Sequence, residues 1–160
     1  MKISTKGRYA LMMLLDLAEH KDEGFIPLKD IAVRQGISKN YLEQIMPILK
    51  KTDILKTTRG FQGGYKLAKA PNQYTVGYII RVTEGSIAPV VCLDGETNEC
   101  LRSGFCKTLS VWRGLEQVIA DYLDSITLQD ILDKSDAPTL AHTRFAAKKP
   151  CGFGAFADRF

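Results

Sequence analysis

The most constraining feature of this 160-residue chain is a helix–turn–helix rhythm in its first third. A short helix is expected over residues 28–35, and Gly36 should stop it in a tight turn. Ser38 is a suitable N-cap for a following helix that runs to about Lys51. Apolar residues recur on this helix at intervals of three and four, which marks its buried side. Pro47 predicts a bend or a local end within it.

The segment after these helices predicts a β-hairpin. Residues 54–58 and 65–68 are strand-like, and a basic, glycine-rich turn separates them. Because the hairpin directly follows a helix–turn–helix, we interpret it as a wing, although a plain β-hairpin would have the same pattern. Arg59 at its tip is the residue expected to enter a minor groove, where narrow A·T-rich stretches attract arginine.

A long helix is expected over residues 107–125, after a short helix over residues 75–83 and a loop over residues 85–105. Its apolar side chains are spaced three and four residues apart, as in a coiled-coil seam. An intradomain face could produce one or two such turns, but a stripe of this length favours pairing with a second copy of the chain. The residues expected in this dimerisation seam are Trp112, Leu115, Ile119, Tyr122 and Ile126.

Charge is distributed unevenly along the chain. Residues 1–70 contain 13 Lys and Arg against 7 Asp and Glu, whereas residues 71–160 contain 9 against 11. A basic amino-terminal half fits a polyanionic partner, although a solvated basic face would look the same. The apolar runs are too short for a membrane span and the start lacks a secretory signal, so a cytoplasmic location without membrane contact is expected. The sequence has no catalytic motif, and we expect no enzymatic activity.

Three cysteines lie close together in the second half, at Cys92, Cys100 and Cys106. Clustered thiols in a cytoplasmic chain indicate metal binding or redox chemistry more than structural disulfides. Structural zinc favours cysteine pairs two residues apart, and this spacing of seven and five residues contains none. From the residues alone, an iron–sulfur cluster, zinc and free redox thiols all stay open.

Several segments together are similar to one family. They are Lys2-Ile-Ser-Thr-Lys-Gly-Arg-Tyr-Ala-Leu11, Ile37-Ser-x-x-Tyr-Leu-Glu-Gln-Ile45, Arg59-Gly-x-x-Gly-Gly-Tyr-x-Leu67, and the three cysteines ahead of Trp112. Across about residues 1–134 the chain resembles the IscR-like (Rrf-type) bacterial transcription regulators. The resemblance implies a homodimeric winged helix with a long dimerisation helix, in which three cysteines bind a 4Fe–4S or 2Fe–2S cluster.

The resemblance also implies which residues meet double-stranded DNA. The positions that face the major groove or its backbone match a run at the start of the second helix of the motif, and the wing matches an arginine with its turn glycines. Asn suits adenine, and Glu suits cytosine or rejects other bases. The implied DNA-binding residues are Ser38, Lys39, Asn40, Tyr41, Glu43, Gln44, Arg59, Gly60, Gly63 and Gly64.

The cysteine site departs from the family pattern at its fourth ligand. Members with a complete site place a His three residues after the last cysteine, where this chain has Leu109. Others use a carboxylate of the partner subunit at the position that is Arg8 here. The fourth ligand must then come from elsewhere, or one iron is left open to a small molecule. The remaining candidates are Asp94, Glu96, Glu99, a solvent thiol or Cys151.

These observations predict a mainly α chain with three parts. Residues 1–70 form a winged helix–turn–helix DNA-binding domain with a two-stranded wing, residues 71–134 hold the cluster-binding loop and the dimerisation helix, and residues 135–160 are a basic tail. The expected function is a homodimeric regulator, acting on inverted-repeat operators, whose DNA binding responds to an iron–sulfur cluster. The alternative is a cluster-free regulator of the same fold that cysteine oxidation or a protein partner switches.

Overall fold

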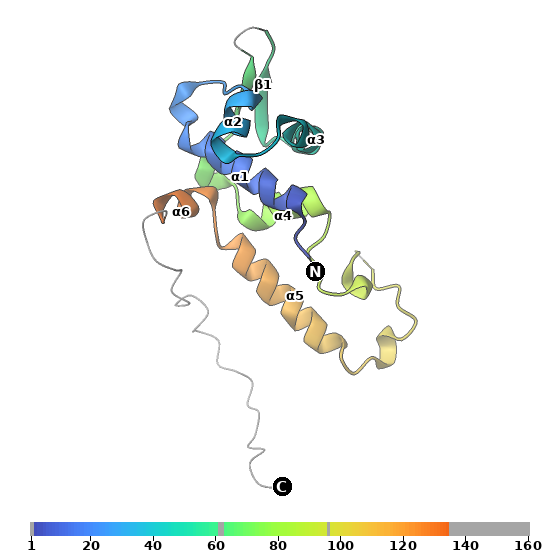
Figure 1. Ribbon diagram of the computed structural model, residues 1–160. Coiled ribbons are helices and arrows are strands. Elements are labelled where there is room, and N and C mark those ends of the chain that lie inside the picture. The colour runs from blue at the N-terminus through green and yellow to red at the C-terminus, as the bar shows by residue number, and fades with distance from the viewer. Residues whose placement is uncertain (1, 61–62, 96, 135–160) are drawn as a thin grey trace.

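The computed structural model describes residues 2–60, 63–95 and 97–134, and within them the fold is mainly helical (Figure 1). The predicted tail, with Cys151, lies outside the described residues. The helices and strands are α1 (Thr5–Glu19), η1 (Lys21–Glu23), α2 (Leu28–Gln35), α3 (Lys39–Lys50), β1 (Leu55–Thr58), β2 (Gly64–Leu67), η2 (Pro71–Gln73), α4 (Val76–Glu84), η3 (Val91–Leu93), η4 (Ser103–Phe105), α5 (Leu109–Asp124) and α6 (Leu128–Asp133), where η denotes a 3-10 helix.

Local signals set the ends of the first three α-helices. The Ser4 hydroxyl accepts from the Gly7 N–H at 3.3 Å and begins α1, and the Ser38 hydroxyl accepts from the Tyr41 N–H at 3.2 Å and begins α3. Gly36 ends α2 with a left-handed φ of 63°. The apolar sides of these helices meet in one core, whose fully buried members include Met13, Leu14, Leu17, Ile31, Leu42, Ile45 and Leu49.

Of the bend or local end predicted at Pro47, the local end is wrong, because α3 continues through Pro47 to Lys50, close to the predicted end at about Lys51. Pro47 itself is exposed, while Leu49 in the last turn is fully buried. Burial of an apolar side chain of this size offsets the loss of one backbone hydrogen bond. Tertiary packing therefore keeps the last turn helical.

The wing is an antiparallel pair in which Leu55 lies opposite Leu67 and Thr58 opposite Gly64. Ile26 forms a one-residue antiparallel β-bridge with β2, because its N–H and carbonyl both pair with Tyr65 at 2.9 Å. This β-bridge attaches the wing to the segment before α2. The winged helix–turn–helix with a two-stranded wing is thus confirmed.

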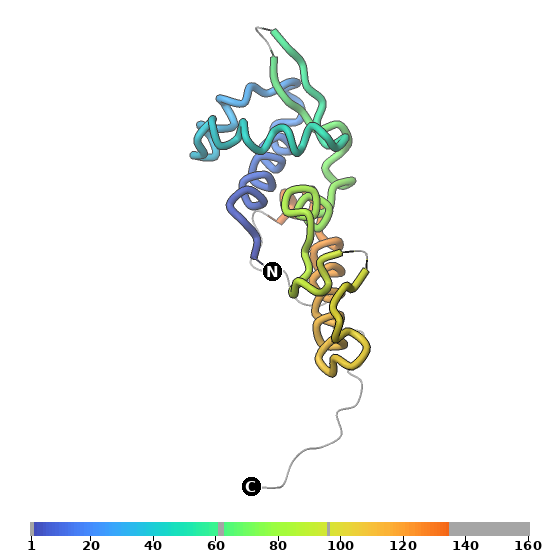
Figure 2. Tube along the Cα trace, turned by 90° about the vertical axis from the view of Figure 1, so that its right-hand side faces the viewer, coloured from blue at the N-terminus to red at the C-terminus, as the bar shows by residue number. Residues whose placement is uncertain are grey.

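The second half of the chain leads away from this domain. Helix α4 contacts both α1 and α5, and a β-bridge between Thr75 and Thr127 joins the starts of α4 and α6. In both views α5 extends away from the wing, and the segment with the three cysteines lies beside its far end (Figures 1 and 2). None of the described helices is long and apolar enough to cross a membrane.

Candidate nucleic-acid interface and cysteine loop

The amino-terminal end of α3 presents a polar face to solvent. Its buried side is fixed by Leu42, Ile45 and Leu49, which pack into the core. The opposite side therefore faces outward, and five of the six residues predicted to meet DNA on this helix are exposed: Ser38, Lys39, Asn40, Glu43 and Gln44. This exposed polar face is what a helix needs to enter a major groove.

The sixth residue, Tyr41, is placed differently. Its ring packs edge-on against that of Tyr9, with the ring centroids 5.3 Å apart and the planes at 78°. It is half-buried, so a large part of the ring serves to hold α1 against α3.

Charges on the α3 face are partly paired. The Lys39 Nζ lies 3.0 Å from the Glu43 Oε1, one turn along the helix, and both side chains are about half exposed. An exposed pair of this kind contributes little to stability. It does place a cation beside the carboxylate, which reduces the repulsion between Glu43 and a phosphate backbone.

A groove of ≈ 420 Å³ lies between the start of α2, the outer face of α3 and the wing. Its cations are Lys29, Lys39 and Arg59, and its carboxylate is Glu43. Gly60, Gly63 and Gly64 also line it, and Gly64 is the first residue of β2 and not part of the turn as predicted. A Cβ on Gly64 would lie only 2.5 Å from the Ile26 carbonyl oxygen, so glycine lets the wing join the neighbouring segment.

The cysteine loop, residues 85–108, connects α4 to α5. Cys92, Cys100 and Cys106 are all free and half-buried. Cys92 lies in η3, and Cys106 follows η4. Within the part of the chain that the structure describes, no three His, Cys, Asp or Glu side chains form a group ready to hold a metal ion. The loop therefore supplies three thiols without bringing them to one point.

The chemistry of this loop nevertheless fits an iron–sulfur cluster. The Thr108 hydroxyl lies 3.5 Å from the Cys106 sulfur, and hydrogen bonding from Thr108 lowers the pKa of that thiol, which favours the ligating thiolate. The Asn98 Oδ1 accepts from the Cys100 N–H at 3.0 Å. The buried Asn98 Nδ2 has no acceptor among the described residues, and cluster sulfurs are hydrogen-bond acceptors. Neither Asn98 nor Thr108 was predicted from the sequence, because an amide or hydroxyl in a loop has no distinctive pattern.

The remaining predicted ligands have no such arrangement. Asp94 and Glu99 are exposed loop residues, whereas Glu96 and Cys151 lie outside the described residues. Leu109 is buried at the first turn of α5, and Arg8 is exposed on α1.

The apolar stripe predicted on α5 divides between two faces. Ile119 and Ile126 pack inside the chain against the cluster of Val76, Ile80 and Ile87. Leu115 and Tyr122 stay exposed, at 42% and 38%, and Trp112 is half-buried. Val111 and Val118 extend the exposed face, giving a strip with spacings of four, three and four residues: Val111, Leu115, Val118 and Tyr122.

A carboxylate links the base of the cysteine loop to the winged domain. Glu84, the last residue of α4, accepts from the Ser4 hydroxyl at 2.7 Å and from the Gly7 N–H at 3.1 Å. A negative charge is favourable at the start of α1 because the helix dipole is positive there. A Cβ on Gly7 would collide with this carboxylate, so glycine allows the contact.

Helix α4 is also tied to α5. Arg81 forms an ion pair with Asp124, which in addition accepts from the Thr75 hydroxyl at 3.3 Å. Helix α4, which leads into the cysteine loop, thus contacts both α5 and α1.

The chain matches known regulators over most of its length. Residues 3–134 match the family model Rrf2, described as an iron-dependent transcriptional regulator. The chain is 38% identical over 141 residues to the HTH-type transcriptional regulator IscR of Pectobacterium atrosepticum, covering 88% of this chain and 85% of that protein.

Solved structures agree with these relatives. The T. potens IscR structure is 42% identical with a TM-score of 0.68, covering 91% of this chain and 96% of that one. The structure of CymR, the global cysteine regulator of B. subtilis, is 38% identical with a TM-score of 0.70, covering 85% and 99%. The predicted resemblance is confirmed: the chain belongs to the Rrf2 family of transcriptional regulators.

Proposed function

We propose that this protein is a homodimeric, DNA-binding regulator whose operator affinity is set by an iron–sulfur cluster on Cys92, Cys100 and Cys106. The observation that supports DNA binding is the exposed polar face of α3 beside a wing whose groove holds three cations and one carboxylate. Phosphates supply affinity through such cations, and side chains on the helix supply sequence preference.

In this proposal the dimer forms through α5. The strip of Val111, Leu115, Val118 and Tyr122 leaves a row of large apolar side chains in water, at spacings that suit a second helix. Two copies related by a two-fold axis would present two α3 helices to an inverted repeat, with half-sites one helical turn apart or a multiple of it.

The cluster would be held by the three thiolates, and it would supply redox and ligand-exchange chemistry when bound. Contacts of the loop and of α4 would couple the cluster site to the DNA-binding domain. Movement of the loop is passed to α4, and Glu84 then acts on the start of α1. The cluster can shift operator affinity only if the loaded and empty loops favour different placements of the two α3 helices.

A cluster-free regulator is the second candidate, and the CymR likeness favours it. One of the similar structures is an oxidised form of Staphylococcus aureus CymR, at 33% identity with a TM-score of 0.65. All three described cysteines of this chain are free thiols, and the pKa of Cys106 is lowered, which suits oxidation.

The decisive test compares anaerobically purified wild type with the triple variant Cys92→Ser, Cys100→Ser, Cys106→Ser. We expect iron and sulfide in the wild type and neither in the variant. Operator affinity should differ by about fivefold or more between loaded and empty wild type, because allosteric coupling is typically of that size.

The further variant Cys151→Ser tests the tail thiol as fourth ligand: it should lose iron and sulfide only if Cys151 completes the site, and should otherwise retain both. Equal operator affinity of loaded and empty protein would contradict cluster control. An iron-free wild type whose binding changes on thiol oxidation would establish the second candidate instead.

Arg59→Ala tests the role of the wing. We expect about tenfold weaker operator binding and a shallower dependence on salt, because one cation at the DNA is lost. Cluster loading should be unchanged, since Arg59 directly follows β1 and the wing lies at the other end of the fold from the cysteine loop (Figure 1). Fluorescence anisotropy at several salt concentrations provides the measurement, with Lys21→Ala in η1 as the matched control. Binding equal to that of the wild type would remove Arg59 from the interface.

A further inference from the structure

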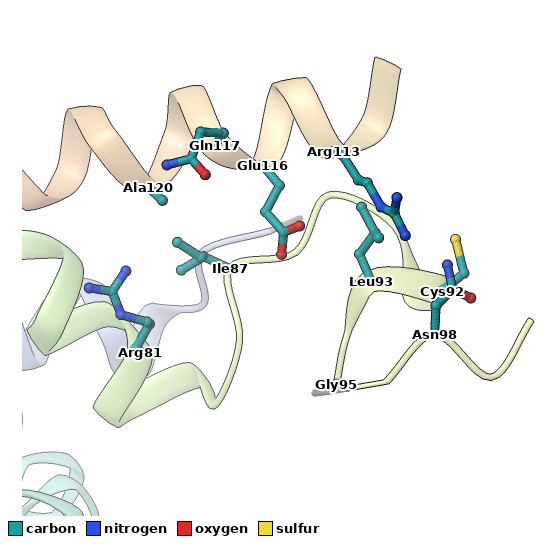
Figure 3. A pocket seen from close by; sticks show the side chains of 10 residues that line it. All are labelled: Arg81, Ile87, Cys92, Leu93, Gly95, Asn98, Arg113, Glu116, Gln117 and Ala120. Atoms are coloured by element: carbon teal, nitrogen blue, oxygen red, sulfur yellow. The ribbon is translucent and has the colours of Figure 1, made fainter. Parts of the chain in front are cut away.

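A cavity of ≈ 560 Å³ lies between the cysteine loop and α5 (Figure 3), and none of the residues predicted to bind DNA lines it. Arg113, Glu116 and Ala120 line it from α5, one turn after another, and Ile87 and Leu93 line it from the loop. Its size is within the range of small-molecule sites, which are mostly apolar with a few polar groups that fix orientation.

The ionic groups of this cavity differ in how they are engaged. Arg81 at one end is already paired with Asp124. Neither Arg113 nor Glu116 has a hydrogen-bond or ion-pair partner among the described residues, and the two are not paired with each other although they lie three residues apart. One cation and one anion therefore face the same cavity, and no described residue pairs with either charge.

The two unpaired charged groups, Arg113 and Glu116, lie at different positions along the cavity. In Figure 3 the Arg113 guanidinium lies toward the Cys92 end of the cavity, and the Glu116 carboxylate lies farther along, between Leu93 and Ile87. Ile87 is buried, and Leu93 and Ala120 are half-buried, so an apolar surface lies beside the two charges. Cys92 and Asn98 also line the cavity, whereas Cys100 and Cys106 do not, so the cavity borders the proposed cluster site on one side.

We propose that this cavity binds a free α-amino acid with an apolar or small side chain. The guanidinium of Arg113 would take the α-carboxylate, for which its planar fork of donors is suited, and Glu116 would take the α-ammonium. The side chain would contact Ile87, Leu93 and Ala120. A simple anion would gain Arg113 but meet Glu116, and a phosphorylated ligand would bring more negative charge than Arg113 offsets.

Such a ligand would bear on the cysteine loop directly. Cys92 and Leu93 of η3 both border the cavity, so an occupant would hold η3 against α5. The ionic groups of the proposed site are on α5, while Cys92 belongs to both this cavity and the proposed cluster site. The binding tests are therefore made on protein with and without iron.

The test uses full-length protein and the common amino acids, added one at a time at millimolar concentration. Isothermal titration and the shift in melting temperature are the measurements, because a ligand of the folded state raises the melting temperature. We expect a subset with apolar or small side chains to bind. Their methyl esters and their N-acetyl derivatives, which each lack one charge, should bind at least about tenfold more weakly.

Variants assign the two charges. Arg113→Gln and Glu116→Gln should each weaken binding by about tenfold or more, and Arg113→Gln should also remove the preference for the free acid over its ester. Glu19→Gln, an exposed carboxylate at the end of α1, is the matched control and should bind as the wild type does. The proposal is overturned if no amino acid binds, if the esters bind equally well, or if both variants retain wild-type affinity.

Discussion

Val118→Glu on α5 is expected to make the protein monomeric and to abolish tight operator binding. Val118 is 52% exposed at the middle of the apolar strip, so the substitution leaves the folded chain unstrained. In the proposed dimer it would bury an unpaired charge on each side, at a cost of about 3–5 kcal/mol. Since 1.4 kcal/mol is a factor of ten, the dimer dissociation constant should rise by at least about a hundredfold.

Sedimentation at micromolar concentration and operator titration are the two measurements. Val33→Glu is the matched control for self-association, because Val33 is even more exposed, at 82%, but lies on α2. It should remain dimeric. A Val118→Glu protein that self-associates like the wild type would show that the apolar strip of α5 does not form the interface.

The strip itself shows where sequence periodicity reaches its limit. Spacings of three and four residues correctly indicate a helix with an apolar side, yet α5 has two such sides. Ile119 and Ile126 pack against α4 in the same chain, whereas Leu115 and Tyr122 remain in water. Only the position of α4, which follows from contacts far apart in sequence, decides which apolar residues are available to a partner.

Elements with local signals were predicted well. The bounds of α2 agree with the sequence prediction, because the left-handed Gly36 ends the helix through contacts within a few residues. The capping box from Thr127 to Asp130 is present, with both reciprocal hydrogen bonds formed. The link from Glu84 to Ser4 spans 80 positions and could not be predicted, because no local pattern identifies its partners.

The cysteine loop could be predicted only in part. The spacing of its thiols predicts ligands, but the loop has little regular structure that would fix where they point. The fourth ligand also stays open for this reason, since Asp94 and Glu99 are simply exposed. The ionic groups of the α5 cavity were missed altogether, because Arg113 and Glu116 have the pattern of a solvated helix face.

Asp16 is the second residue at which a large effect is expected. It is 1% exposed on α1, and its carboxylate accepts from Arg34 at 2.9 and 2.6 Å and from Gln35 at 3.1 Å. Both donors lie in the last turn of α2, immediately before Gly36. These hydrogen bonds hold α2 against α1 and so fix the position from which α3 is presented to DNA.

Asp16→Asn should lower the free energy of unfolding at pH 7 by about 2–3 kcal/mol, because charge-assisted hydrogen bonds are lost in a buried site. The effect should stay below that of a fully buried pair, since the Arg34 side chain is 31% exposed and water can solvate it. Urea denaturation provides the measurement. Asp22→Asn in η1 is the matched control, because Asp22 is exposed, and it should change stability by less than about 0.5 kcal/mol.

The pH dependence of the stability difference shows whether the charge or the shape of the Asp16 side chain stabilises the protein. Burial alone would raise the pKa of the Asp16 carboxyl, but hydrogen bonds from Arg34 and Gln35, together with the Arg34 charge, outweigh burial and lower the pKa below its ordinary value of 3.8. A depressed folded-state pKa means that the stabilisation is present above the unfolded pKa and disappears as the pH falls through the folded one. The difference between wild type and Asp16→Asn should therefore shrink below about pH 4. A difference that persisted undiminished to about pH 2 would show that the shape of the side chain, and not its ionisation, stabilises the helix pair.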